Sequence, residues 1–170
     1  KVEKDGKYGF IDKNGKVVVE PQFDDAEPFS EGLAQVKKGR KYGFIDKSGK
    51  MVIEPQFDLV FDFSEGLACV EKDGKWGFID KSGKMVIEPQ FDDAEPFSEG
   101  FAKVEKDGKY GFIDKSGKVV IEPQFDRVEA VLHNFVYNTI FSEGLAKVEK
   151  DGKYGFIDKN GKVVIEPQFD

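Results

Sequence analysis

Apolar and polar residues alternate along the chain in short groups separated by paired turn residues. The pairs Asp5-Gly6 and Asn14-Gly15 divide the first 24 residues into KVEK, KYGFIDK and KVVVEPQFD. Asp-Gly and Asn-Gly are strong signals for two-residue hairpin turns of type I′, because both central residues need a positive φ. Further along, Gly39-Arg40 replaces Asp-Gly, which suits a type II′ turn with glycine first. The pattern therefore predicts a three-stranded antiparallel meander.

Two-residue turns also fix which residues lie opposite one another. The expected pairs are Glu3 with Tyr8, Val2 with Gly9, Phe10 with Val19 and Ile11 with Val18. Both faces of the meander are then largely apolar, whereas a sheet with water on one side alternates apolar and polar residues. We expect each sheet to be covered on both faces by its neighbours.

Two residues are unusual for strand positions. Gly9 in mid-strand predicts a close approach, either of a neighbouring ring or of the next sheet. Pro21 lacks an N–H and is expected to end the pairing of the third strand. The connector that follows contains Phe29, which is expected to be a buried anchor, and has room for a fourth short edge strand.

The meander recurs five times. The step from Tyr8 to Tyr42, Trp76 and Tyr110 is 34 residues each time, and the last step, to Tyr154, is 44. A fixed period in this range is typical of stacked repeat architectures. We expect one all-β domain over residues 1–170, with repeats at about 1–34, 35–68, 69–102, 103–146 and 147–170. Five tandem three- to four-stranded antiparallel meanders predict a propeller-like ring, with an open β-superhelix or solenoid as the alternative.

Composition and charge narrow the function. The net charge is −7, so the basic stripe expected of a nucleic-acid-binding protein is missing, and anionic membrane surfaces are also unfavourable. No apolar run is long enough to span a bilayer as a helix. The chain begins inside a repeat at Lys1, with neither an initiator Met nor a signal peptide, which indicates a trimmed recombinant piece and leaves localisation open.

The segments GKYGFIDKSGKMVIEPQFD and GKWGFIDKSGK, with a preceding FSEGLA, resemble the WG repeat, a tandem β-repeat of bacterial proteins named for its Trp-Gly pair. That pair is Trp76-Gly77 here and Tyr-Gly in the other four copies. The resemblance covers all but residues 127–140, implies an all-β scaffolding or binding role, and supplies no catalytic residues. Residues 1–24 and 147–170 differ only at Val19 and Ile165, a uniformity that favours an idealised or designed sequence over recent natural duplication.

The largest departure from the repeat is the connector at residues 127–140, RVEAVLHNFVYNTI, where other copies have four residues such as Asp-Ala-Glu-Pro. Helical spacing of its apolar residues favours a short helix in the first half. A turn at His133-Asn134 would instead pair Leu132 with Phe135 and Val131 with Val136 as an extra hairpin. The segment is either a recognition loop on a rigid scaffold or a structural insertion that packs on the body.

A second departure replaces Asp-Ala-Glu-Pro with Leu59-Val60-Phe61-Asp62. Cys69 and Gln35, where three copies have Lys, are expected to accompany this change, and Trp76 for Tyr is interpreted as a packing change. The two connectors are expected to form one patch or pocket. The candidate binding residues are Val131, Leu132, His133, Phe135, Tyr137, Leu59, Val60 and Phe61.

The sequence gives little indication of a catalytic or metal-binding site. His133 is the only histidine and has no second His or Cys to complete a zinc site. The repeated Asp-Lys-Ser-Gly lacks the acids and the final bidentate Glu of a calcium loop. We therefore expect no catalytic residues, no metal and no cofactor.

These observations predict a non-enzymatic repeat scaffold, designed in origin, whose variant connector recognises a protein or peptide. The alternatives are a small-molecule binder with a pocket near Cys69 and His133, and a natural bacterial envelope or secreted interaction module.

Overall fold

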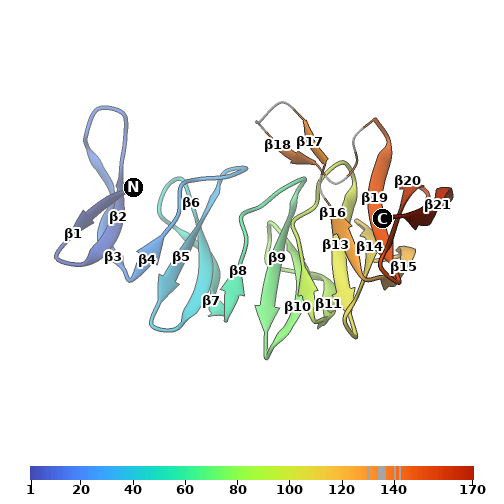
Figure 1. The fold of residues 1–170 in the computed structure, drawn as a ribbon. Helices are drawn as coiled ribbons and strands as arrows, with labels where there is room; N and C mark the ends of the chain where they lie inside the picture. The colour runs from blue at the N-terminus through green and yellow to red at the C-terminus, as the bar shows by residue number, and fades with distance from the viewer. Residues whose placement is uncertain (130, 134–136, 140, 142) are drawn as a thin grey trace. The chain divides into compact units, whose positions relative to one another are not determined.

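The computed structural model describes residues 1–129, 131–133, 137–139, 141 and 143–170, and its regular elements are all β-strands (Figure 1). Within these residues the strands form five antiparallel sheets of three or four strands and one two-stranded sheet. The prediction of an all-β chain built from five tandem meanders is confirmed.

Each of the five larger sheets contains one meander. The meander strands are β1 (Val2–Lys4), β2 (Lys7–Ile11) and β3 (Val17–Phe23); β5 (Leu33–Lys38), β6 (Lys41–Asp46) and β7 (Met51–Phe57); β9 (Leu67–Lys72), β10 (Lys75–Asp80) and β11 (Met85–Phe91); β13 (Phe101–Lys106), β14 (Lys109–Asp114) and β15 (Val119–Phe125); and β19 (Leu145–Lys150), β20 (Lys153–Asp158) and β21 (Val163–Phe169). We refer to these sheets as the first to the fifth, in chain order.

The predicted fourth edge strand is present in four of the sheets. These edge strands are β4 (Asp25–Ala26), β8 (Leu59–Val60), β12 (Asp93–Ala94) and β16 (Arg127–Glu129). Each pairs with the first strand of the following meander, as β4 does with β5 and β8 with β9. Every connector is therefore anchored to the edge of the next sheet.

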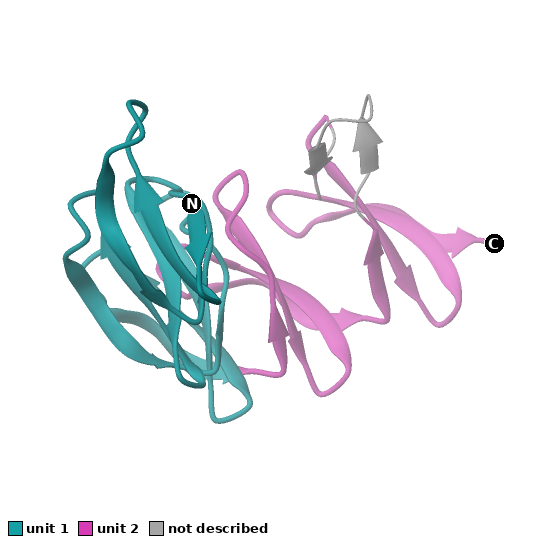
Figure 2. Ribbon diagram, turned by 90° about the vertical axis from the view of Figure 1, so that its left-hand side faces the viewer, with its two compact units in different colours: residues 1–90 teal, residues 91–170 magenta. Residues whose placement is uncertain are grey.

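The chain divides into two compact units, residues 1–90 and 91–170 (Figure 2). The first unit contains the first two sheets and nearly all of the third, and the second unit contains the fourth and fifth. The single domain over residues 1–170, and the choice between ring and superhelix, stay predictions.

The first turn of each meander is as predicted. Asp5 and Gly6 have φ values of 53° and 72°, which is a type I′ turn, and the register Val2 with Gly9 and Glu3 with Tyr8 is confirmed. Gly39 has a φ of 64° in the pair that was expected to form a type II′ turn.

The second turn differs from the prediction. Asp12 N–H donates to the Lys16 carbonyl at 2.8 Å, so the loop has three residues, and Gly15 has a φ of 80°. The Asp12 carboxylate accepts the N–H groups of Asn14 and Lys16, at 2.8 and 2.9 Å, which stabilises this longer turn. Ile11 consequently pairs with Val17 and not with Val18, so that predicted pair is wrong, whereas Phe10 with Val19 is confirmed.

Gly9 and Pro21 belong to one feature, a bulge between β2 and β3. Pairing resumes beyond Pro21, where Phe23 lies opposite Tyr8, so the prediction that Pro21 ends the strand is wrong. A Cβ on Gly9 would lie 2.4 Å from the Val19 carbonyl oxygen and 2.7 Å from Pro21 N. The close approach that glycine permits is therefore to the next strand of the same sheet, and not to a ring or to the next sheet.

The apolar core lies between successive sheets, and both faces of the second sheet contribute to it. On one face, Val36 and Ile45 pack in a cluster with Phe10 and Val19 of the first sheet. On the other face, a second cluster joins the second sheet to the third; its buried members are Leu33, Phe44, Ile53, Phe57, Val60, Phe63, Ala68, Val70 and Ile79. The expectation that neighbouring meanders cover both apolar faces is confirmed for this sheet.

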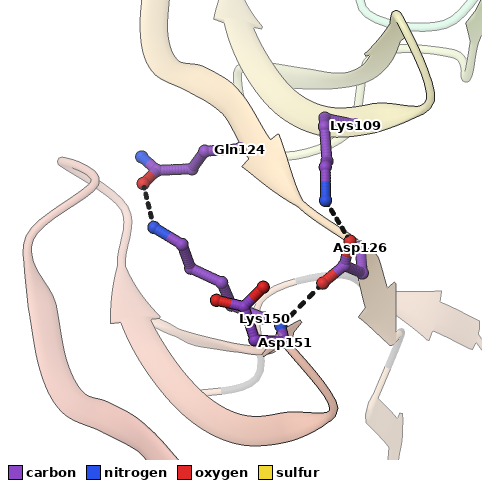
Figure 3. A network of polar contacts seen from close by, with 5 residues as sticks. All are labelled: Lys109, Gln124, Asp126, Lys150 and Asp151. Carbon is purple, nitrogen blue, oxygen red and sulfur yellow. Dashed lines mark hydrogen bonds and ion pairs between the residues drawn. The ribbon is translucent and has the colours of Figure 1, made fainter.

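A recurring pair of hydrogen bonds to one aspartate links each meander to the next. The Asp126 carboxylate accepts the Lys109 ammonium of its own sheet on one oxygen and the N–H of Asp151, in the turn of the next sheet, on the other (Figure 3). In the first unit Asp58 has the two equivalent partners: the Lys41 ammonium at 2.5 Å and the N–H of Asp73 at 3.1 Å. Near the Asp126 link, the Lys150 ammonium also donates a hydrogen bond to the side-chain oxygen of Gln124 at 3.4 Å (Figure 3).

These links predict acid sensitivity. The hydrogen bond from Lys41, followed by that from the Asp73 N–H, lowers the pKa of Asp58. Because the folded-state pKa is depressed, the stability is fully present above the unfolded value, near 4, and is lost as the pH falls through the folded value. We expect Tm to fall below about pH 4, and Asp58→Asn to lower Tm near pH 7 and to flatten that fall. Thermal unfolding followed by circular dichroism across this range is the measurement, and an equal slope in the variant would contradict the role of Asp58.

The inserted connector forms a separate antiparallel hairpin between β16 and β19 (Figure 1). Its strands are β17 (Val131–His133) and β18 (Tyr137–Thr139), and Val131 lies opposite Thr139. The predicted short helix is wrong at Val131–His133, because cross-strand pairing satisfies this backbone. The predicted pairs Val131 with Val136 and Leu132 with Phe135 are wrong as well, because Val131 lies opposite Thr139 and Leu132 opposite Asn138. Phe135 and Val136 lie outside the described residues.

Candidate functional site

The predicted site residues at the edge of the third sheet divide into two groups. Val60 is 9% exposed and belongs to the core between the second and third sheets, so it cannot meet a partner. Leu59 and Phe61 are 48% and 43% exposed, because the period of two along an edge strand turns alternate side chains outward. Leu59 and Phe61 therefore remain as surface candidates.

Phe61 rests on Trp76. The two ring centroids are 5.3 Å apart, with an angle of 31° between the rings. Trp76 is only 9% exposed and Cys69 is fully buried, so Phe61 carries most of the aromatic surface here. We call Phe61, Cys69 and Trp76 the apolar triad. The interpretation of Trp76 as a packing residue agrees with this contact.

The same three repeat positions are ionic in the fourth and fifth sheets. The Lys103 ammonium lies 2.5 Å from Glu95 and 5.3 Å from the centroid of the Tyr110 ring. In the fifth sheet, Lys147 lies 2.8 Å from the Glu129 carboxylate and 3.8 Å from the Tyr154 ring. A Glu, a Lys and a Tyr thus form an ionic triad where the third sheet has Phe61, Cys69 and Trp76.

The charges of the ionic triad stabilise each other. The hydrogen bond to Glu129 raises the pKa of Lys147, and the same contact lowers the pKa of Glu129. Replacing only one member would leave a charge without its partner. In the third sheet neither charge is present, whereas the second sheet keeps Glu27 and Tyr42 beside Gln35.

A second coordinated change lies beside the triad. Gln35 replaces Lys in the second repeat and donates its amide to the Asp62 carboxylate at 2.9 Å. Asp62 in turn stands where other connectors have Pro28 or Pro96. The expectation that Gln35 and Cys69 accompany the altered connector agrees with these contacts, although sequence reasoning did not identify either partner.

The remaining predicted residues lie in the hairpin of the second unit. Val131, Leu132 and His133 form β17, and Tyr137 begins β18. Phe135 falls outside the described residues. That the two connectors form one patch stays a prediction.

Other chemistry has little basis in the described part of the chain. The Cys69 thiol has no exposed surface, so it cannot line an open pocket. Among the described residues no group of three or more His, Cys, Asp and Glu side chains could hold a metal ion. The same residues contain no helix that is long and apolar enough to cross a membrane.

Comparison with known families gives five consecutive matches. The model of the WG containing repeat matches residues 8–42, 42–76, 76–110, 110–154 and 154–170. No curated protein sequence matches the chain.

Solved structures give only distant similarity, at 16% identity in each case. A plant lectin with two metal binding sites from Cicer arietinum has a TM-score of 0.30, covering 75% of this chain and 81% of the lectin. A plant albumin from Cicer arietinum showing hemagglutination has a TM-score of 0.32, with 86% and 92% covered. The seed albumin LS24 from Lathyrus sativus has a TM-score of 0.31, with 86% and 91% covered. At these TM-scores the similarities carry no argument about this chain.

Proposed function

The chain belongs to the WG containing repeat family, and on that premise we propose that it is a non-enzymatic binding module which recognises a protein or peptide through its variant connectors. The repeated sheets supply the scaffold, and the connectors present side chains at the sheet edges. The uniformity of the copies supports an idealised or designed origin for this body.

One observation carries the proposal. At the edge of the third sheet, an ionic triad is replaced as a whole by an apolar one, and the replacement leaves Phe61 43% exposed beside Leu59 at 48%. A purely structural repacking would bury the new aromatic ring. Exposed aromatic and aliphatic side chains that rest on a rigid support are typical of the central residues of protein interfaces.

The backbone around Phe61 favours an extended peptide. β8 is the outermost strand of its sheet, whose order is β11-β10-β9-β8. An edge strand has unpaired N–H and C=O groups along one side, and peptides bind such edges by adding a strand. Leu59 and Phe61 lie two residues apart, so they would contact alternate side chains of such a peptide.

The test is selection from a displayed library of random peptides. We expect enriched peptides to lose at least about tenfold in affinity on the double variant Leu59→Asp with Phe61→Glu, as for central interface residues. Val52→Asp is the matched control, because Val52 is an exposed valine of the same unit, at 36%, and lies in β7. Peptides that bind both variants equally well would exclude this edge as the site.

The inserted connector is tested separately. Replacing residues 127–140 with Asp-Ala-Glu-Pro restores the ordinary repeat. The shortened protein should keep its circular dichroism spectrum while losing those peptides that bind the hairpin. If neither this variant nor the double variant affects any selected peptide, recognition by the connectors is wrong. If the shortened protein does not fold, the insertion is structural.

A further inference from the structure

The carboxylate of Glu71, beside the apolar triad, lacks the partners that its counterpart has in the fifth sheet. Glu71 lies between Leu59 and Trp76 in one row across the third sheet. Residues opposite one another in antiparallel strands share a face, with Cβ atoms about 4.5–5.5 Å apart. The corresponding row of the fifth sheet is Arg127, Glu149 and Tyr154.

In the fifth sheet, Glu149 has three polar neighbours. The Arg127 Nε atom lies 3.9 Å from the Glu149 carboxylate. Partial burial, followed by a hydrogen bond to Glu149, raises the pKa of Tyr154. The pKa of Lys147 is raised mainly by its hydrogen bond to Glu129, and to a smaller extent by Glu149. The charge of Glu149 is thus balanced by side chains of its own sheet.

In the third sheet, none of these three positions carries a cation or a hydroxyl group. The replacements are Leu59 for Arg127, Cys69 for Lys147 and Trp76 for Tyr154. Glu71 is half-buried, and within the first unit no described residue forms an ion pair or a side-chain hydrogen bond with its carboxylate. The carboxylate therefore has no balancing charge in its own sheet.

A second loss of positive charge lies on the other side of the same connector. In the fourth sheet Lys103 forms an ion pair with Glu95 at 2.5 Å. In the second sheet the lysine position is taken by Gln35, whose carbonyl accepts the N–H of Glu27 and whose side-chain amide donates to Asp62 at 2.9 Å. The described part of the first unit supplies no ion pair to either of these two carboxylates.

We propose that this edge selects peptides in which a lysine or an arginine lies two residues from an apolar residue. This inference rests on the proposed function and names the class of peptide that the edge binds. In a strand added to β8, the apolar side chain packs on Phe61, and the cation takes the place of the missing partner of Glu71. Charge complementarity favours such a peptide, because the carboxylates of Glu27, Asp62 and Glu71 border the edge.

The length of a basic side chain fits this arrangement. Neighbouring strands lie about 4.8 Å apart, so a peptide strand beside β8 lies about 10 Å from β9, which carries Glu71. The aliphatic stem of a lysine or arginine can lie along the exposed Leu59 side chain while its charged end reaches the Glu71 carboxylate. Phe61 follows Leu59 by two residues, so the peptide residue that meets Phe61 lies two positions from the cation.

The peptides enriched by the library selection provide the first test. Phe61→Ala, which changes no charge, identifies the peptides that bind this edge, and these should contain the basic residue two positions from an apolar one. Glu71→Gln keeps the shape of the side chain and should weaken their binding about five- to tenfold, as measured by fluorescence anisotropy. Glu54→Gln is the matched control, because Glu54 is an exposed glutamate of β7 in the same unit. It removes the same charge and should leave the affinity unchanged.

An exchange of charges separates a direct contact from a general electrostatic effect. A selected peptide whose basic residue is replaced by Glu should bind Glu71→Lys more tightly than it binds the parent protein. On Glu71→Gln, replacing the basic residue of the peptide by Gln should have little further effect, because the two changes remove the same interaction. Circular dichroism verifies that each variant keeps the fold.

The outcomes distinguish this inference from the proposed function. Peptides that depend on Phe61 but contain no basic residue at this spacing, or that bind Glu71→Gln as tightly as the parent protein, would overturn the inference and leave the proposed function standing. If no selected peptide depends on Phe61, the proposed site itself is wrong, and the inference is wrong with it.

Discussion

Replacing Gly43 with alanine is expected to destabilise the first unit by about 3 kcal/mol or more, the upper range for overpacking a close-packed interior. An added Cβ would lie 2.3 Å from the Ile53 carbonyl oxygen and 2.7 Å from Pro55 N. Both atoms are backbone of the neighbouring strand, so no side chain can rotate away. Relief would require the bulge between β6 and β7 to open, which would shift Tyr42 away from Phe57. Urea unfolding followed by circular dichroism measures the loss.

Gly66→Ala separates this steric effect from the ordinary cost of losing a glycine. Gly66 has a φ of 86° and nothing within 4 Å of an added Cβ. The variant should lose only about 1–2 kcal/mol, which is the cost of a left-handed conformation for an L-residue. Equal losses in the two variants would mean that the close approach at Gly43 has no special importance.

The sequence predicted those parts of the fold that depend on neighbouring residues. Asp5-Gly6 specifies its own type I′ turn, and the strand pairs beside it follow. The two-residue turn predicted from Asn14-Gly15 is wrong because of a side chain outside the pair. The Asp12 carboxylate accepts two N–H groups of the loop and stabilises a longer turn. A dipeptide signal contains no information about such a neighbour.

Gly9 and Pro21 were each recognised as unusual but were explained separately. They lie in adjacent strands, and one bulge explains both of them: the proline needs no partner for an N–H, and the glycine leaves room for the proline backbone. Their relation depends on the register beyond Phe10, where the bulge places Tyr8 opposite Phe23. Turn signals alone do not specify a bulge within the strands.

At the candidate site, the sequence identified which positions vary but not which of them touch. Phe61, Cys69 and Trp76 come from a connector and from two strands, and only the pairing of β8, β9 and β10 brings them together. The available signal was that all three positions depart from the repeat within residues 61–76. The same applies to Gln35 and Asp62, which are 27 residues apart and form a direct hydrogen bond. The residues at 127–140 were recognisable as an insertion, but their hairpin register depends on cross-strand pairs that propensity alone does not specify.

Mutual covering of the sheets has a consequence for function. The second sheet packs both of its faces against neighbouring sheets, with Val36 on one side and Phe44 on the other. Surface that can change without loss of the fold is then confined to turns and connectors. The apolar triad lies at a connector, which agrees with this restriction.

The same substitution should therefore have very different effects at buried and half-buried positions. Phe44→Ala is expected to cost about 3–5 kcal/mol, because Phe44 is 1% exposed between two sheets and its removal leaves a cavity. Phe156 has the same neighbours in sequence and lies opposite Ile165, as Phe44 lies opposite Ile53. It is only half-buried. Phe156→Ala should cost about 1–2 kcal/mol, since only part of the transfer free energy is lost and no closed cavity forms.

Urea unfolding of the two variants, followed by circular dichroism, measures this difference. Equal costs would show that the cover of the neighbouring sheet contributes little, and that each meander is stabilised mainly by its own strands.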